Sequence, residues 1–323
     1  MRISAPGKLM LIGEYAVLEG GPALVTAVNR RAHASSAGPP SELTSTDNPG
    51  ALDFAVLSQE VASALIMAQA LTKHYVANFQ LDTHELHERG TKLGLGSSAA
   101  GAVASAAIAF ALAGWDIAKP SVQAQLWEVA LRAHQTVAPH GSGADVASAV
   151  YGGTLRIERT GGPPNIAAIA WPECLHLSVI WTKVPARTHS FLASLKTMKS
   201  NNPDLYQRCS EALIRTSEDF IHHFEMGASQ GVKAATQAFG RALDKLGQAA
   251  SIPIFTPAIR AICLRAEECG GTAKPSGAGG GDVCVAFFED EASQRAFETR
   301  CQRDNFPIVA ISCHQQGVRR DKE

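Results

Sequence analysis

The sequence predicts an α+β fold of two domains, and three observations carry this prediction. Strand-like segments cluster near the amino terminus, long helical stretches fill the second half, and the two never alternate regularly as in a doubly wound sheet. A proline-rich patch at Pro163, Pro164 and Pro172 marks a junction. We therefore expect domains at 1–168 and 169–323, each with enough residues for a core.

The first domain is expected to begin as a hairpin-rich sheet. Lys8–Ile12, Ala23–Val28 and Arg31–Ser36 read as strands, and Glu19-Gly20-Gly21 as the first turn. A loop rich in Pro, Gly, Ser and Asn follows at about 38–50. The remaining elements are a helix at Leu52–Val76, a strand at Asn78–Thr83, helices at Ser97–Ala113, Val122–Val137 and Asp145–Tyr151, and a strand at Thr154–Glu158.

The second domain reads as strands flanking a long helical region. The expected elements are a strand at Leu175–Trp181, helices at about 189–199, 203–226, 229–247 and 256–268, a strand at Val283–Phe288, a helix at Glu291–Arg303 and a strand at Ile308–Cys313. The last residues, Arg319–Glu323, are expected to form a frayed tail.

Composition excludes several classes of function. A formal net charge of −1 provides no basic field for nucleic acid and no polybasic patch for a membrane. The uncharged stretch 93–115 is dominated by Ala, Gly and Ser without flanking anchors, which favours a buried helix over a membrane span. The amino terminus lacks an apolar signal core, and the seven scattered cysteines lack metal-ligand spacing. We expect a cytoplasmic protein with reduced thiols.

The most informative segment is Gly94-Leu95-Gly96-Ser97-Ser98-Ala99-Ala100. Its glycines let the backbone approach a bulky anion, and an uncharged Ala-rich helix then presents its positive dipole end beside two hydroxyls. This pattern predicts a polyphosphate cradle, with Ser97 or Ser98 as a ligand of Mg²⁺. The alternative is a tight turn in which one of these serines is only the helix N-cap.

Two other nucleotide-binding patterns do not fit. The spacing of the same glycines meets the loose dinucleotide pattern, but Glu88, Arg89 and Lys92 separate them from the preceding strand. Asp116, at the expected acidic distance, follows a helix end and no second strand. The Walker arrangement of glycines before Lys-Ser/Thr is absent from the sequence.

Lys8 and Asp145 are the candidate charged groups of a site. Lys8 sits in an apolar strand, where an unpaired ammonium is costly, so it either reaches water or faces an anionic ligand. Asp145 follows Gly141 and Gly143 at the start of a short helix. It is either a cap residue or a rigidly placed carboxylate that pairs with Lys8, and sequence periodicity leaves both interpretations open.

Two further glycine-rich segments flank Gly94–Ala100 in the chain. The first is Pro6-Gly7-Lys8 running on to Gly13-Glu14-Tyr15, and the third is the loop Ser276-Gly277-Ala278-Gly279-Gly280-Gly281-Asp282, which directly precedes a strand. A bulged hairpin explains one or two of its glycines. Four glycines indicate close approach of the backbone to a ligand or to another loop.

Taken in this order, the three segments resemble the GHMP small-molecule kinase family over most of the chain, from Lys8 to Asp282. Within the family, Gly141–Gly152 (GSGADVASAVYG) and Lys92 are most similar to phosphomevalonate kinases. Mevalonate kinases usually have Pro or Gly where this chain has Lys92, a histidine where it has Tyr15, and a second acidic metal ligand in the region of His134 and Gln135.

The resemblance implies an N-terminal half like ribosomal protein S5 domain 2, a ferredoxin-like C-terminal half, and an active site between them. It implies that Lys8 and Asp145 are catalytic. The implied ATP-binding residues are Lys92, Gly94, Leu95, Gly96, Ser97, Ser98, Ala99 and Ala100, with Mg²⁺ on Ser97 or Ser98. The implied substrate-binding residues are Ser142, Gly143, Arg187, Ser276, Gly277, Ala278, Gly279 and Gly280.

The activity implied by the resemblance is transfer of phosphate from ATP to 5-phosphomevalonate, which gives 5-diphosphomevalonate in the mevalonate route to isoprenoids. The partners are then ATP and a small molecule, with no nucleic acid or membrane, and the protein is a monomer or homodimer. Alternatives are a mevalonate kinase, another small-molecule kinase of the family, or a non-catalytic sensor of ATP or a metabolite. Lys8 and Asp145 disfavour the sensor, and Lys8 disfavours a related decarboxylase.

Overall fold

The computed structural model describes residues 1–36, 41–42, 57–139, 141–159, 164–186 and 188–322. Its N-terminal half is built on a largely antiparallel sheet with strand order β13-β1-β2-β8-β9, and β5 also pairs with β2. The strands are β1 (Arg2–Ile12), β2 (Pro22–Ser36), β5 (Phe79–Asp82), β8 (Thr154–Glu158), β9 (Asn165–Ile169) and β13 (Arg319–Arg320). Two further pairs of two-residue strands lie in the connections among the described residues: β6 (His87–Glu88) with β7 (Thr91–Lys92), and β3 (Ser41–Glu42) with β4 (His74–Tyr75).

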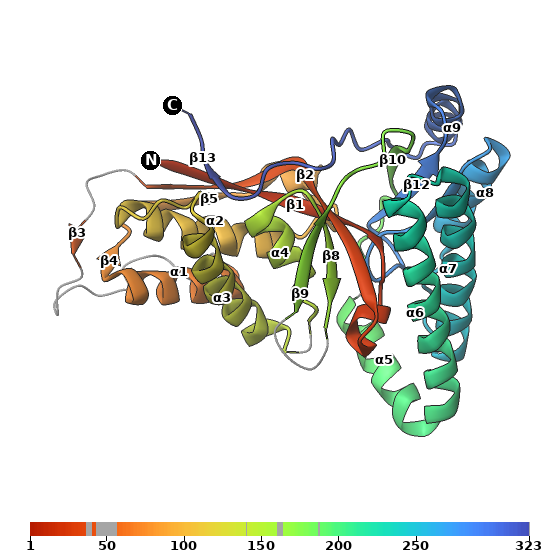
Figure 1. Ribbon diagram of the computed structural model, residues 1–323, viewed down its shortest axis with the longest axis horizontal. Helices are drawn as coiled ribbons and strands as arrows, with labels where there is room; N and C mark the ends of the chain where they lie inside the picture. The colour runs from red at the N-terminus through yellow and green to blue at the C-terminus, as the bar shows by residue number, and fades with distance from the viewer. Residues whose placement is uncertain (37–40, 43–56, 140, 160–163, 187, 323) are drawn as a thin grey trace.

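Helices pack on this sheet in two tiers (Figure 1). α2 (Ser97–Leu112) and α4 (Ala144–Tyr151) contact β1 and β2, while α1 (Gln59–Thr72) and α3 (Pro120–Val137) pack against α2. α2 consists largely of buried Ala, a strong helix former whose small side chain allows neighbouring elements to approach closely. The segment 93–115 thus contains a buried core helix, as expected. No helix of the described ranges is long and apolar enough to cross a membrane.

The C-terminal half contains a three-stranded antiparallel sheet in the order β10-β12-β11. Its strands are β10 (His176–Trp181), β11 (Thr272–Pro275) and β12 (Val283–Phe288), and its helices are α5 (Thr188–Asn201), α6 (Pro203–Glu225), α7 (Ser229–Ala249), α8 (Pro257–Glu268) and α9 (Glu291–Arg303). The long helices α6 and α7 lie side by side (Figure 1). The predicted α+β fold is confirmed.

The predicted strand at Ile308–Cys313 is wrong in extent. Only a single bridge forms there, between Ile308 and Ile180, with Trp181 N–H donating to Pro307 O at 2.9 Å and Val309 N–H to Val179 O at 2.8 Å. The chain therefore occupies the free edge of β10 for one bridge and then leaves it, because Asn29 and Thr26 of β2 engage the backbone of Ser312 and His314 instead.

The predicted helix at Leu52–Val76 is also shorter in the structure. Residues 52–56 lie outside the described part, and α1 begins at Gln59, where the Ser58 side chain accepts a hydrogen bond from Val61 N. The helix ends at Thr72, because Lys73 adopts a left-handed conformation with φ 57°.

The predicted frayed tail is wrong. Arg319 and Arg320 form β13, which pairs with Ile3 and Ser4 of β1, and the Asp321 carboxylate accepts the Ser4 hydroxyl. The buried guanidinium of Arg31 donates to the carbonyls of Gln316 and Gly317. The end of the chain thus returns to the N-terminal sheet, near the amino terminus in Figure 1. The domain division at 168 remains a prediction. Arg319 and Arg320, which lie in the predicted second domain, form a strand of the sheet of the first.

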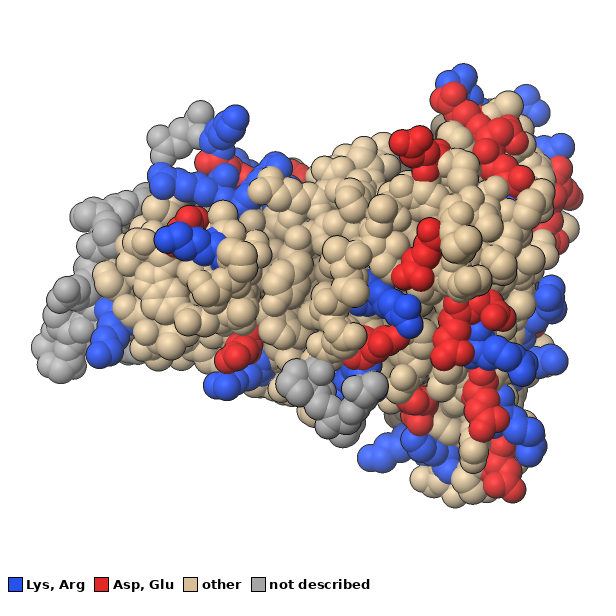
Figure 2. Space-filling model, in the orientation of Figure 1, with Lys and Arg blue, Asp and Glu red and all other residues tan. Residues whose placement is uncertain are grey.

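The two halves share a hydrophobic core. Leu9, Leu11 and Leu24 of the N-terminal sheet belong to the same buried cluster as Phe220 and Phe224 of α6. On the outside, charged side chains of both signs intersperse over the helices of the C-terminal half, while the visible N-terminal face is largely uncharged (Figure 2). A site between the halves therefore rests on a rigid, packed seam.

Candidate active site

Lys8, Gly96 and Asp145, which are far apart in the sequence, meet at one point. The backbone N–H of Lys8 donates to Leu95 O at 2.9 Å, which ties β1 to the glycine segment. A Cβ added at Gly96 would lie 3.4 Å from the Asp145 Cβ and 3.4 Å from the Lys8 Cγ. The side chains of Lys8 and Asp145 thus both lie beside Gly96, where a larger residue would crowd them.

The glycine segment has the geometry of an anion cradle. Gly94 and Gly96 adopt left-handed conformations with φ 76° and 73°, and α2 begins at Ser97 without a side-chain cap or an acidic residue in its first turn. The first N–H groups of a helix have no intrahelical partner and carry the positive end of its dipole. Gly96 itself is the N-cap, so neither Ser97 nor Ser98 is the cap residue of the alternative interpretation.

Asp282 is a neighbour that the sequence prediction left out of the site. A Cβ at Gly94 would overlap the Asp282 carboxylate, whose Oδ1 accepts the Ala186 N–H at 3.0 Å. Burial raises the pKa of Asp282, while this N–H and the positive charges of Lys8 and Lys92 act in the opposite direction. Both lysines therefore lie within electrostatic reach of Asp282. Its position directly after the third glycine run was the available signal.

A buried ion pair joins the first and third glycine segments. The Lys274 amine donates to the Glu14 carboxylate, and their side chains are 0% and 2% exposed. The same Glu14 Oε1 accepts the Gly277 N–H at 3.2 Å, and Lys274 also donates to Pro275 O at 2.8 Å. Burial lowers the pKa of Lys274 although the Glu14 charge opposes it. Breaking one partner would leave a buried charge unpaired, so this pair fixes how the loops meet.

The first residues of the third loop are held by hydrogen bonds to β1 and to Tyr15. The Ser276 hydroxyl accepts the Met10 N–H and donates to Met10 O, each at 3.0 Å, and the Tyr15 hydroxyl donates to Ala278 O at 2.6 Å. Ser276 is buried, and its hydroxyl is used by these bonds to β1. The substrate-binding roles of Ser276–Gly280 remain predictions. A Cβ at Gly277 would meet nothing within 4 Å, so the loop has open space beside that residue.

Asp145 is held at the start of α4 by its own backbone. Gly143 is the N-cap with φ 73°, the Ser142 hydroxyl accepts the Ala144 N–H at 3.3 Å, and Asp145 Oδ1 accepts the Val146 N–H at 3.0 Å. The structure therefore places Ser142 and Gly143 beside Asp145. Arg187, the remaining predicted substrate contact, lies outside the described residues.

His134 occupies the region where mevalonate kinases are expected to carry a second acidic ligand. Its Nδ1 lies 3.0 Å from Glu60 Oε1 of α1, and a Cβ at Gly141 would press on its other ring nitrogen. Burial acts to lower the pKa of His134, but the hydrogen bond to Glu60 and the charges of Asp145 and Glu60 raise it to about 9. The raised pKa favours a protonated imidazole at this position, and its positive charge interacts with the Asp145 carboxylate.

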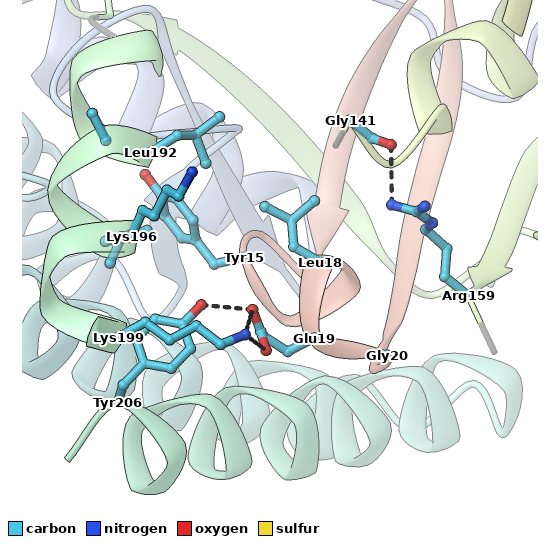
Figure 3. Close-up of a pocket in the computed structure, with 12 residues that line it drawn as sticks. Tyr15, Leu18, Glu19, Gly20, Gly141, Arg159, Leu192, Lys196, Lys199 and Tyr206 are labelled. Carbon is cyan, nitrogen blue, oxygen red and sulfur yellow. Dashed lines mark hydrogen bonds and ion pairs between the residues drawn. The ribbon is translucent and has the colours of Figure 1, made fainter. Parts of the chain in front are cut away.

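A cavity of about 690 Å³ lies between the turn that follows β1 and helix α5 (Figure 3). Tyr15, Leu18 and Gly141 line it from the N-terminal half, and Leu192, Lys196 and Lys199 line it from α5. We call it the side cavity. It borders the start of the loop that leads to Asp145 and, through Tyr15, the third glycine loop.

Comparison with known proteins identifies the family. The family description "GHMP kinases N terminal domain" matches residues 64–153, and "GHMP kinases C terminal" matches residues 232–307. The chain belongs to the GHMP kinase family. The first match contains the glycine segment and Asp145, and the second contains the third glycine loop, which agrees with the segments that carried the resemblance.

Individual GHMP kinases align along nearly the whole chain. It is 28% identical to a phosphomevalonate kinase of Streptomyces sp. over 95% of both chains, and 27% identical to a mevalonate kinase of Aeropyrum pernix over 98% of this chain and 97% of the other. A Streptococcus pneumoniae phosphomevalonate kinase, solved with phosphomevalonate and AMPPNP, superposes with a TM-score of 0.77 at 21% identity, covering 97% of this chain and 99% of that one. The fold is thus that of the kinases in this family.

Proposed function

We propose that this protein transfers the terminal phosphate of ATP to 5-phosphomevalonate and so forms 5-diphosphomevalonate. The observation that carries phosphotransfer is the meeting of Lys8, Asp145 and the uncapped start of α2 around Gly96. The choice of acceptor is supported by the similarity to a phosphomevalonate kinase over 95% of the chain. It is also supported by His134, which replaces the second acidic residue expected of a mevalonate kinase.

The residues present fit a nucleotide with Mg²⁺. The described part of the chain contains no cluster of three or more His, Cys, Asp or Glu side chains that could hold a metal by itself. Mg²⁺ commonly binds through one or two protein oxygens together with substrate phosphates. The hydroxyl of Ser97 or Ser98 and the carboxylate of Asp145 would therefore be enough as protein ligands. Bound there, the ion would neutralise phosphate charge.

Charge neutralisation is the chemistry that this acceptor requires. The second pKa of a phosphomonoester is about 6, so the attacking oxygen is already anionic at neutral pH and needs no general base. The obstacle is repulsion between two polyanions, which the positive charges of Lys8, Lys92 and the α2 terminus would offset. Asp145 would hold Lys8 in position and would have little need to remove a proton.

The test is an ADP-release assay with a panel of acceptors: 5-phosphomevalonate, mevalonate, isopentenyl phosphate, homoserine and galactose. We expect turnover with 5-phosphomevalonate to exceed that with every other acceptor. Substantial turnover of mevalonate alone would overturn the assignment and favour the second candidate, a mevalonate kinase. The 27% identity to the Aeropyrum pernix enzyme supports that candidate, and in it Asp145 would act as the general base for an alcohol.

A further inference from the structure

The side cavity has a mostly apolar wall with cations at its edge. Leu18 and Leu192 contribute aliphatic surface from opposite halves of the molecule, and Tyr15 adds an aromatic ring to the lining (Figure 3). Small-molecule sites typically combine such apolar lining with a few placed polar groups that fix orientation. The composition of the cavity therefore suits a ligand with a short aliphatic body and a charged end.

The charges in the side cavity do not cancel. Its acid, Glu19, accepts two hydrogen bonds from the Lys199 amine, at 3.0 and 2.7 Å, and one from the Tyr206 hydroxyl at 2.7 Å. Lys199 is thus neutralised. Lys196, one turn earlier on the same helix, is exposed, and its amine has no ion pair or hydrogen bond among the described residues. In Figure 3 it extends toward the same end of the cavity as the Tyr15 hydroxyl.

The side cavity borders two elements of the predicted transfer site. Gly141 lies four residues before Asp145, and Tyr15 donates to the third loop at Ala278. The side cavity is therefore connected, through Gly141 and Tyr15, to segments that also carry the predicted transfer site. 5-Phosphomevalonate carries a phosphate at one end of a five-carbon chain and a carboxylate at the other.

We infer that the side cavity binds the carboxylate end of the acceptor and that Lys196 is the cation that recognises it. This inference rests on the proposed function, because it takes the acceptor to be an acid with two anionic ends. Lys8 and Lys92 then serve the reacting end, Lys196 serves the distal end, and Leu18 and Leu192 cover the aliphatic chain between them.

The test replaces Lys196 with Met, which keeps the aliphatic stem and removes the charge. We expect KM for 5-phosphomevalonate to rise about tenfold, as is typical for loss of a charged hydrogen bond, while KM for ATP stays within about twofold. Calorimetric titration of 5-phosphomevalonate without nucleotide should show the same loss of affinity. Lys196→Arg should restore most of it, and Lys119→Met, at an exposed lysine before α3, should change nothing.

A second arm removes the carboxylate from the ligand. Isopentenyl phosphate has a phosphate on a five-carbon chain but no carboxylate, so Lys196→Met should leave its binding unchanged and reduce the preference of the enzyme for 5-phosphomevalonate about tenfold. Equal weakening of both ligands would overturn the inference, as would an unchanged KM for 5-phosphomevalonate in an active enzyme; the proposed function survives both results.

A failure of the proposed function would appear in the acceptor panel with the wild-type protein, and not in the Lys196 variants. If wild type phosphorylates mevalonate only, the proposed acceptor is wrong. Mevalonate also carries a carboxylate, so a rise in KM for mevalonate in Lys196→Met would still support the cavity assignment, and an unchanged KM would overturn it. If the only acceptor is a sugar or another molecule without a carboxylate, both proposals are overturned together.

Discussion

The second and third glycine-rich loops look alike in sequence but use their glycines differently. At Gly96 an added Cβ would meet Lys8 and Asp145, two predicted catalytic side chains, at the start of an uncapped helix. At Gly279 and Gly280 it would strike Ile254 and Phe191, which belong to the hydrophobic core that the two halves share. A high density of glycine therefore indicates that other atoms come close to the backbone, but it does not identify them. Only the residues around each glycine distinguish a candidate ligand site from a packing contact.

The largest effect that tests this comparison is expected at Lys8. Lys8→Met removes the amine beside the cradle, and turnover with 5-phosphomevalonate should fall by a factor on the order of 10² or more, typical of lost charge stabilisation. The urea midpoint should hardly change, because Lys8 is only half-buried and makes no ion pair among the described side chains. Measurement of kcat on the purified variant decides the matter, and a loss below about fivefold would count against Lys8 as a catalytic residue.

The second prediction sets the two loops against each other. Gly96→Ala places a methyl group beside Lys8 and Asp145 at ordinary contact distance, so kcat/KM should fall at least about tenfold as phosphate approach is obstructed. Its unfolding free energy should fall by only about 1 kcal/mol, the cost of an alanine at positive φ. Gly279→Ala forces a methyl into Ile254 and should lose about 2–3 kcal/mol of stability while the folded fraction keeps most of its activity.

Urea unfolding gives the unfolding free energy of both alanine variants, and steady-state kinetics give their kcat/KM. Gly277→Ala serves as the control for backbone strain, since it shares a positive φ and would meet no atom within 4 Å. If Gly279→Ala loses activity without losing stability, the third loop faces the substrate directly, and the contrast between the loops is wrong.

The sequence predicted elements that carry local signals better than elements that form only through tertiary contacts. The Ala-rich run from Ser97 and the glycines before it are local signals, so α2 and the cradle could be read directly. The ends of the chain could not, because β13 exists only through its pairing with β1 and through carbonyl contacts to Arg31. A charged tail such as Arg319–Glu323 carries no local strand preference, and tertiary contacts decide its structure.

The same distinction applies to the candidate site. Lys8 and Asp145 were proposed from charge in an apolar strand and from a carboxylate after glycines, which are local features, and their proximity to Gly96 in the structure is consistent with that proposal. The pairing of Glu14 with Lys274 and of Glu60 with His134 joins residues 260 and 74 positions apart, and nothing in either segment alone predicts it. Asp282 falls between these cases, since its neighbours in sequence were recognised but its contact with Gly94 was not.

The effect expected at His134 depends on pH and leaves catalysis aside. The pKa of His134 rises from 6.5 to about 9 on folding, so the folded state binds its proton more tightly than the unfolded state. The resulting stabilisation is fully present below pH 6.5 and is lost as pH rises through about 9. A shift of this size corresponds to at most about 3 kcal/mol. The difference in unfolding free energy between wild type and His134→Gln should therefore shrink by up to that amount between pH 6 and 9.5.

Urea unfolding at the two pH values measures this difference. His84→Gln is the matched control, because the His84 side chain is 72% exposed and its pairing with Asp82 should contribute almost nothing. A difference between wild type and His134→Gln that stays constant across the range would mean that His134 is not charged in the folded protein. In that event the position beside Asp145 holds a neutral hydrogen-bonding ring. The contrast with the acidic ligand expected of a mevalonate kinase would then rest on the lost carboxylate alone, without an added positive charge.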